Sequence, residues 1–198
     1  MEQDLRIYAK GLAFSDGIYD MRTLENLISN NRKILDGLVA VQLGRRQITP
    51  AIKKQLNYEV SINPGSIELL LNFALDHKEV LGVFAADGGE IFSEVLIKLL
   101  KNAIDLREKA SSLISKGISI NINISKSFNI GSRVDSPDVS FGESRGAIYI
   151  SDPKILWAAQ LTRGPINGLL TQLDGNAVEY ISMSSAHNEL MLTPSKEQ

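Results

Sequence analysis

The segment from about residue 90 to residue 116 constrains the fold most strongly, because its apolar residues recur with a helical period. Spacings of four and three residues alternate along the series Phe92, Leu96, Leu99, Ala103, Leu106, Ala110 and Leu113. This is a heptad seam, and Val95 and Leu100 widen it beyond the seam of a two-stranded coiled coil. We predict a long helix here, ended by Gly117, a residue type favoured just after a helix C-terminus.

The heptad seam has two interpretations, and the sequence does not decide between them. The helix either packs at the centre of its own fold or is shared between subunits, and one helix can do both through different stripes. The second reading predicts a homo-oligomer or a protein partner. Its candidate interface residues are Phe92, Leu96, Leu99, Leu106 and Leu113.

Local signals in the first half of the chain predict a strand, a helix and a hairpin. The strand covers about 6–9, and apolar residues at helical spacing place the helix over about 21–43. Asp20 stands where this helix needs an N-cap, and Gly44 follows its end. The turn sequence Asn63-Pro64-Gly65 predicts a hairpin of about 56–62 with 66–74.

The second half begins with the most regular alternation in the chain. Isoleucine alternates with serine or asparagine over 118–125, which predicts a strand with a buried isoleucine face and a hydrated polar face. Short strands are predicted at 139–142 and 147–151. Asp152 followed by Pro153 predicts a helix start, and we expect that helix to end at Gly164-Pro165.

The last third is predicted to be a C-terminal β-meander of the segments 166–173, 177–183 and 189–193, with turns at Asp174-Gly175 and at 184–187. The fold class is therefore α+β: an antiparallel-rich sheet packed against two main helices, at about 21–43 and 90–116. We expect one domain over residues 1–198, with a subdivision, if any, in the polar loop 126–138.

Composition and charge exclude several classes of function. The chain has 198 residues and no cysteine, so disulfides, thiolate catalysis and cysteine-ligated metals are excluded. Its net charge of −2 gives no global basic field, and nucleic-acid binding is not expected. The sequence shows no signal peptide and no membrane-spanning apolar stretch, so we expect a cytoplasmic protein without a membrane partner.

The segment Gly142-Glu143-Ser144-Arg145-Gly146 matches the G-x-S-x-G pattern of the nucleophile elbow in α/β-hydrolases. Asp152, Asp174 and His187 follow in the order serine, acid, histidine. An elbow needs a helix directly after the serine, however, and the residues that follow here have strand character. The segment is therefore predicted to be a hairpin tip. A hydrolase that uses Ser144 or the nearby carboxylates is kept as the third functional hypothesis.

The polar loop that leads to this segment is the predicted ligand site. Two arginines could hold an anion there, and its carboxylates form the nearest approach to a metal-binding cluster. The candidate ligand-binding residues are Arg133, Asp135, Asp138, Ser144 and Arg145. No metal, no cofactor and no catalytic residue is assigned.

A small basic cluster lies between the first helix and the hairpin: Arg45, Arg46, Lys53 and Lys54. Aromatic residues are not interleaved with these cations, as they often are in nucleic-acid sites. We therefore interpret this cluster as a solvated face, or as a site of salt bridges to a partner. Both interpretations are favoured over nucleic-acid binding.

The hairpin sequence YEVSINPGSIELLL (58–71) resembles a hairpin in a group of uncharacterised bacterial hypothetical proteins, over roughly the first 75 residues. The resemblance implies a bacterial or phage-related cytoplasmic protein and carries no catalytic residues. The leading functional hypothesis is a non-catalytic, oligomerising interaction or regulatory protein. The second is a small-ligand or nucleotide sensor.

Overall fold

The computed structural model describes residues 5–17, 19–54, 56–73, 92–124, 139–141, 147–175 and 177–194. Helices and an antiparallel sheet coexist in these residues, which confirms the predicted α+β class. Two compact units form: residues 1–98 together with 161–198, and residues 99–160. The second unit is thus inserted into the first. That both belong to one domain stays a prediction, and the loop 126–138 lies outside the described residues.

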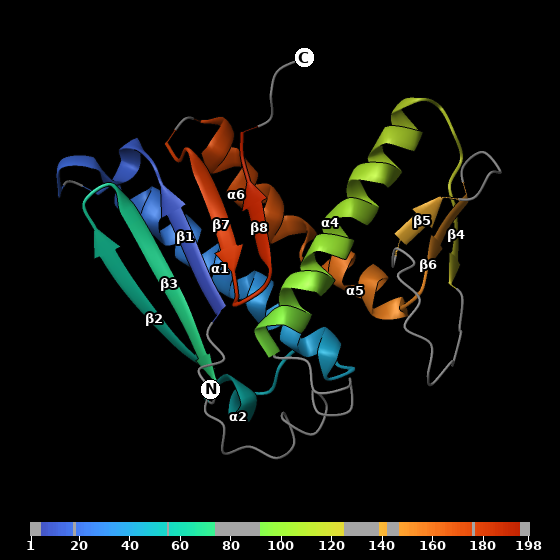
Figure 1. The fold of residues 1–198 in the computed structure, drawn as a ribbon, viewed down its shortest axis with the longest axis horizontal. Coiled ribbons are helices and arrows are strands. Elements are labelled where there is room, and N and C mark those ends of the chain that lie inside the picture. The colour runs from blue at the N-terminus through green and yellow to red at the C-terminus, as the bar shows by residue number, and fades with distance from the viewer. Residues whose placement is uncertain are drawn as a thin grey trace. The chain divides into compact units, whose positions relative to one another are not determined.

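The first unit is built on a five-stranded antiparallel sheet with the strand order β2-β3-β1-β7-β8 (Figure 1). Its strands are β1 (Leu5–Lys10), β2 (Leu56–Asn63), β3 (Ser66–Phe73), β7 (Tyr180–Ser184) and β8 (Glu189–Leu192). The predicted first strand and hairpin are confirmed. The turn between β2 and β3 needs a left-handed residue, which Gly65 supplies with φ = 82°.

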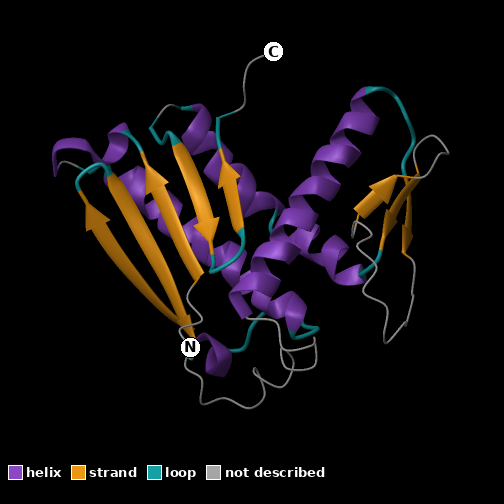
Figure 2. Cartoon of the chain, in the orientation of Figure 1, coloured by secondary structure: helices purple, strands orange, loops and turns teal. Residues whose placement is uncertain are grey.

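Two helices pack together on one face of this sheet, α1 (Met21–Gln42) and α6 (Arg163–Asp174) (Figures 1 and 2). The carboxylate of Asp20 accepts hydrogen bonds from the amides of Arg22 and Thr23, and Gly44 follows the helix with φ = 65°. Both predicted ends of α1 are thus confirmed. Shorter helices, η1 (Leu12–Gly17) and α2 (Pro50–Lys53), flank α1 in sequence.

When η1, α2 and the segment from α4 to α5 are set aside, the remaining elements follow the order β1-α1-β2-β3-α6-β7, which is that of the split βαβ arrangement, with β8 added at one edge. This arrangement occurs in many unrelated proteins and does not by itself assign a function.

Strand alternation gives the sheet one apolar and one polar face. On β1, Leu5, Ile7 and Ala9 are buried toward the helices, and Ile7 lies opposite Leu69 of β3 and Met183 of β7. Burying each large side chain stabilises the fold by roughly 1.5–3 kcal/mol.

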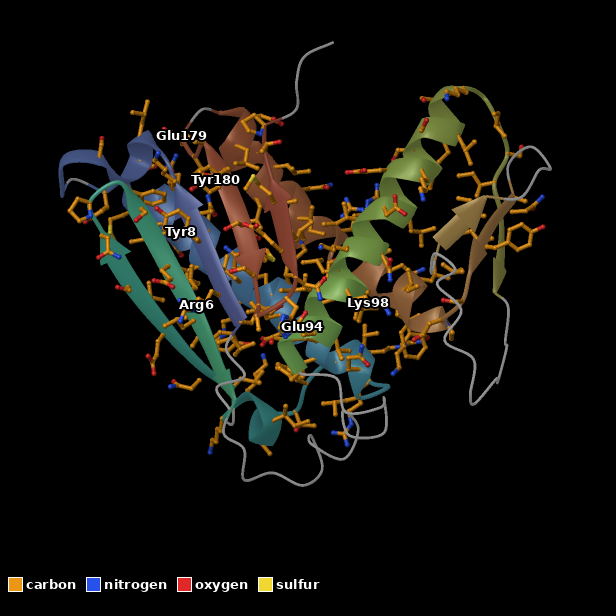
Figure 3. The ribbon with its side chains drawn as sticks, viewed as in Figure 1. Arg6, Tyr8, Glu94, Lys98, Glu179 and Tyr180 are labelled. Carbon is orange, nitrogen blue, oxygen red and sulfur yellow. The ribbon has the colours of Figure 1, made fainter. Side chains whose placement is uncertain are left out.

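The other face of the sheet carries Arg6 and Tyr8 (Figure 3). By the same alternation along β1, it also carries Lys10. The rings of Tyr8 and Tyr180 lie 6.0 Å apart, and Lys10 Nζ lies 3.7 Å from Glu179 Oε2.

The prediction for residues 166–173 was wrong: they form most of helix α6 and not a first meander strand. Ile166, Leu169 and Leu173 are buried at helical spacing, and Pro165 lies in the first turn, where proline is tolerated. Gly175 accordingly caps α6 rather than completing a hairpin turn. The other two predicted meander strands are confirmed as the antiparallel pair β7–β8.

The second unit contains most of α4 (Phe92–Ser115), which confirms the predicted long helix, together with α5 (Pro153–Leu161) up to residue 160. Its three-stranded sheet has the order β4-β6-β5, from β4 (Asn121–Ile124), β5 (Val139–Phe141) and β6 (Ala147–Ile150).

The isoleucine strand is shorter and less covered than predicted. It begins at Asn121, and Ile122 is 41% exposed, so the prediction of a buried isoleucine face was wrong at this residue. The reason is its position: β4 is an edge strand of a small sheet and pairs only with β6 among the described residues.

Candidate functional site

All five residues of the predicted ligand site lie outside the described residues: Arg133, Asp135, Asp138, Ser144 and Arg145. The strands that flank Ser144 are described. β5 and β6 pair antiparallel, with Val139 opposite Ile150, so a strand follows Ser144 where an elbow needs a helix. Asp152 has a structural role, since its Oδ1 accepts a 2.8 Å hydrogen bond from the amide of Lys154.

The residues of the predicted oligomer interface are mostly covered by the chain itself. Phe92, Leu96, Leu99 and Leu106 are buried, and Leu113 is half-buried. Their burial accounts for the heptad seam as core packing, and a second subunit on the seam stays a prediction.

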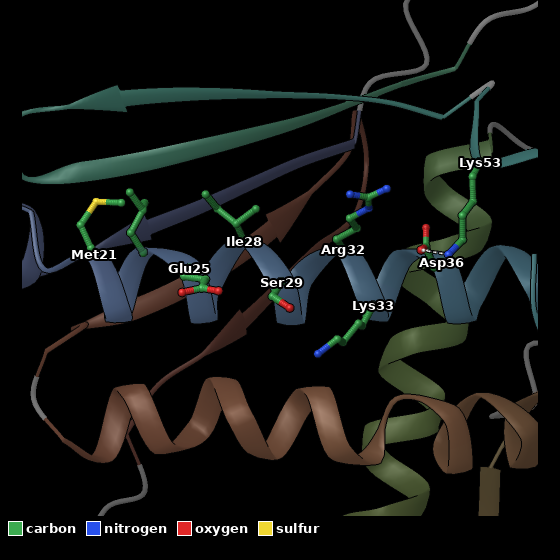
Figure 4. Close-up of a pocket in the computed structure, with 9 residues that line it drawn as sticks. Met21, Glu25, Ile28, Ser29, Arg32, Lys33, Asp36 and Lys53 are labelled. Carbon is green, nitrogen blue, oxygen red and sulfur yellow. Dashed lines mark ion pairs between the residues drawn. The ribbon is translucent and has the colours of Figure 1, made fainter. Parts of the chain in front are cut away.

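A cavity of about 570 Å³ runs along one side of α1 (Figure 4). It is lined by Met21, Leu24, Glu25, Ile28, Ser29, Arg32, Lys33, Asp36 and Lys53. All of these except Lys53 belong to α1. The apolar side chains lie in the first half of the helix, where Met21 is 70% exposed, and the cations lie in the second half. The cavity wall is therefore amphipathic along its length.

A polar junction lies at the charged end of this cavity. Tyr58 of β2 donates a 2.6 Å hydrogen bond to Oδ1 of Asp36, and Lys53 Nζ lies 3.8 Å from Oδ2 of the same carboxylate. The guanidinium of Arg32 lies over the Tyr58 ring, 5.4 Å from its centroid. Burial, followed by the hydrogen bond to Asp36 and its negative charge, raises the pKa of Tyr58 well above the usual 10.0.

A second cavity of about 200 Å³ shares Lys33, Asp36 and Lys53 with the first. Its remaining lining residues are Gly37, Arg46, Gln47, Ile48 and Leu161. Arg46 and Lys53 come from the basic cluster identified in the sequence. The two cavities together are lined by four cationic residues, Arg32, Lys33, Arg46 and Lys53, and two acidic residues, Glu25 and Asp36. This side of α1 is therefore positive in a chain of negative net charge.

The edge strand beside α1 also exposes apolar side chains. Val60 and Ile62 of β2 are 41% and 40% exposed, although their partners on β3, Leu69 and Ile67, are buried on the same face. The cause is the sheet order, because β2 is the outermost strand. Among the described residues, no strand pairs with its free edge.

A second polar cluster joins the start of α4 to the β7–β8 turn. Glu94 lies in the first turn of α4 (Figure 3) and is 8% exposed. Its carboxylate accepts a 2.8 Å hydrogen bond from the His187 amide and another from the Asn188 side chain. Burial raises the pKa of Glu94, but hydrogen bonds from Asn188, the His187 amide and Ser185 outweigh it, so this pKa lies below its usual 4.5. The cluster holds the turn in place.

No group of three or more metal-ligating side chains gathers within the described part of the chain. Among the described helices, none has both the length and the hydropathy to cross a membrane. The chain matches none of the protein-family models, curated proteins or solved structures with which it was compared.

Proposed function

We propose that this chain is a non-catalytic interaction protein that binds another protein surface through α1 and β2. The contact region, here called the α1–β2 surface, consists of Met21, Ile28, Val60 and Ile62 with the cavity along α1. One observation carries the proposal: the exposed side chain of Met21 lines a cavity of about 570 Å³ on α1, and the neighbouring edge strand β2 exposes Val60 and Ile62 and has a free side that no described strand covers.

Two physical arguments support this surface. An edge strand presents unpaired peptide groups that can pair with another strand, and natural proteins usually protect such edges. Clustered apolar side chains with a charged border are typical of interaction sites, because a partner removes them from water while the charges fix its orientation. Complete burial of each side chain contributes roughly 1.5–3 kcal/mol.

A small-ligand sensor is the second candidate, favoured by the smaller, positively lined cavity. Lys33, Arg46 and Lys53 converge there beside the apolar side chains of Ile48 and Leu161, which suits an anion that carries an apolar group. Thermal melts against a panel of nucleotides and organic anions test this candidate, since a ligand that binds only the native state raises the melting temperature.

The interaction proposal is tested by site-specific photo-crosslinking. A photoreactive amino acid is placed at Ile28, and in a matched control at Thr171, an exposed position on α6. Irradiation of cells that express each variant is expected to give defined protein adducts from position 28 only. The proposal would be overturned if both positions gave adducts to the same extent, or if neither position gave any.

A further inference from the structure

We infer that the α1–β2 surface binds a second copy of this chain, with the two β2 strands pairing antiparallel across a two-fold axis. The inference rests on the proposed function, which it makes specific by naming the partner. The resulting dimer would contain one continuous ten-stranded sheet, since each copy contributes five strands in the same plane.

The edge of β2 is suited to this pairing. β2 has eight residues, whereas β8 at the other edge of the sheet has four. Every second residue of an antiparallel edge strand directs its peptide N–H and C=O groups outward. Edges that avoid pairing usually carry charges, proline or a bulge, and β2 carries one charged residue, Glu59, and no proline.

The sequence of β2 is complementary to itself about Val60. With the two-fold axis at this residue, Val60 meets its own copy and Tyr58 meets Ile62, so one face of the junction is apolar. On the other face Asn57 meets Asn63 and Glu59 meets Ser61, and no like charges lie opposite each other. An axis at Glu59 would instead place two carboxylates opposite each other.

The same axis brings complementary charges of the two α1 helices to one level. α1 and β2 run in opposite directions (Figure 4), and Tyr58 of β2 lies level with Arg32 and Asp36 of α1. Two strand residues span about as much length as four helix residues, so the axis at Val60 passes between the levels of Ile28 and Arg32. Glu25 of one α1 helix then lies level with a stretch of the antiparallel partner helix that includes Arg32 and Lys33.

This geometry also accounts for the cavity. The two α1 helices lie on the same face of the continuous sheet, on either side of the axis. The apolar half of each cavity wall, with Met21 and Ile28, faces the other copy, together with the exposed side chains of Val60 and Ile62. A single contact with the second copy would therefore cover both parts of the α1–β2 surface, the apolar cavity wall and the exposed side chains of β2.

The first test is the molar mass of the purified chain, measured by light scattering across micromolar concentrations. We expect twice the 21.7 kDa of one chain. Val60→Arg places two cations opposite each other at the axis and is expected to weaken the dimer by roughly tenfold or more. The control is Ile122→Arg, a strand residue with the same 41% exposure in the second unit, which is expected to leave the dimer unchanged.

The second test uses charge reversal and keeps the inference falsifiable if Val60→Arg does not fold. Glu25→Lys is expected to weaken the dimer, and adding Lys33→Glu in the same chain is expected to restore it. A monomeric wild-type chain, or a dimer indifferent to Val60→Arg and to Glu25→Lys, would overturn the inference. A monomer that still gives adducts with a different protein from position 28 overturns the dimer and leaves the proposed function standing.

Discussion

The hydroxyl of Tyr58 and the carboxylate of Asp36 lie 2.6 Å apart, and their hydrogen bond ties the edge strand β2 to the helix α1. Lys53, at the end of α2, approaches the other oxygen of the same carboxylate. One acidic side chain thus links three elements around the charged end of the cavity.

The Tyr58–Asp36 contact predicts a specific alkaline response. Because the pKa of Tyr58 is raised in the folded chain, its contribution to stability is complete below the usual pKa of 10.0 and is lost as the pH rises above it. Tyr58→Phe removes the hydrogen bond and is expected to cost roughly 1–3 kcal/mol near neutral pH. Chemical denaturation of both chains measures this. A difference between them that does not shrink as the pH rises above 10.0 would contradict the assignment.

The Glu94 cluster predicts an acid response of the opposite sense. The pKa of Glu94 is lowered, so its contribution is present above the usual 4.5 and is lost as the pH falls through the lowered value. Glu94→Gln is expected to destabilise the chain at neutral pH and to remove this part of the acid dependence. Thermal melts as a function of pH measure it, with the exposed Glu189→Gln as the control that should leave the profile unchanged.

Gly11 is predicted to tolerate no side chain. A Cβ atom there would lie 2.6 Å from the carbonyl oxygen of Ala177 and 2.6 Å from Cα of Val178, and backbone atoms cannot turn aside as a flexible side chain can. Gly11→Ala is therefore expected to cost roughly 1–3 kcal/mol or more. Gly164→Ala, in α6 with open space around the added carbon, is the matched control and should be neutral or stabilising. Equal melting temperatures would contradict this account.

Asn31 is predicted to weaken the fold it lies in. Its side chain is fully buried in α1, and neither amide atom has a hydrogen-bond partner among the described residues. Asn31→Leu replaces the unpaired amide with an apolar side chain of the same number of heavy atoms and is expected to stabilise the chain by about 1–3 kcal/mol. Asn26→Leu, on the same helix but half-buried, separates this effect from helix propensity. A destabilised Asn31→Leu chain would point to a polar partner of Asn31.

Elements with strong local signals were predictable from the sequence. The N-cap at Asp20 and the glycine at Gly44 bracket α1 because capping depends on neighbouring residues alone, and the Pro64-Gly65 turn fixes its hairpin for the same reason. The helix α6 was missed because Gly164-Pro165 was interpreted as a stop. Its buried residues Ile166, Leu169 and Leu173 have helical spacing that could have identified it.

The α1–β2 surface was predictable only in its parts. Helix, hairpin and the basic residues Arg46 and Lys53 were all identified from sequence. That Val60 and Ile62 stay uncovered depends on β2 being the outermost strand, and strand order is set by pairing between distant segments that no local pattern encodes. The Tyr58–Asp36 contact likewise joins residues 22 positions apart.

The place of β1 in the sheet determines when the sheet can be completed. β1 lies near the N-terminus, yet it pairs with both β3 and β7, and residues 99–160 intervene before β7 is reached. During synthesis on a ribosome, the edge of β1 that pairs with β7 therefore stays unpaired until the whole second unit has been synthesised. Closing so long a loop makes the final pairing a late and slow step of folding, and until then a half-made sheet is exposed to misassociation with other chains.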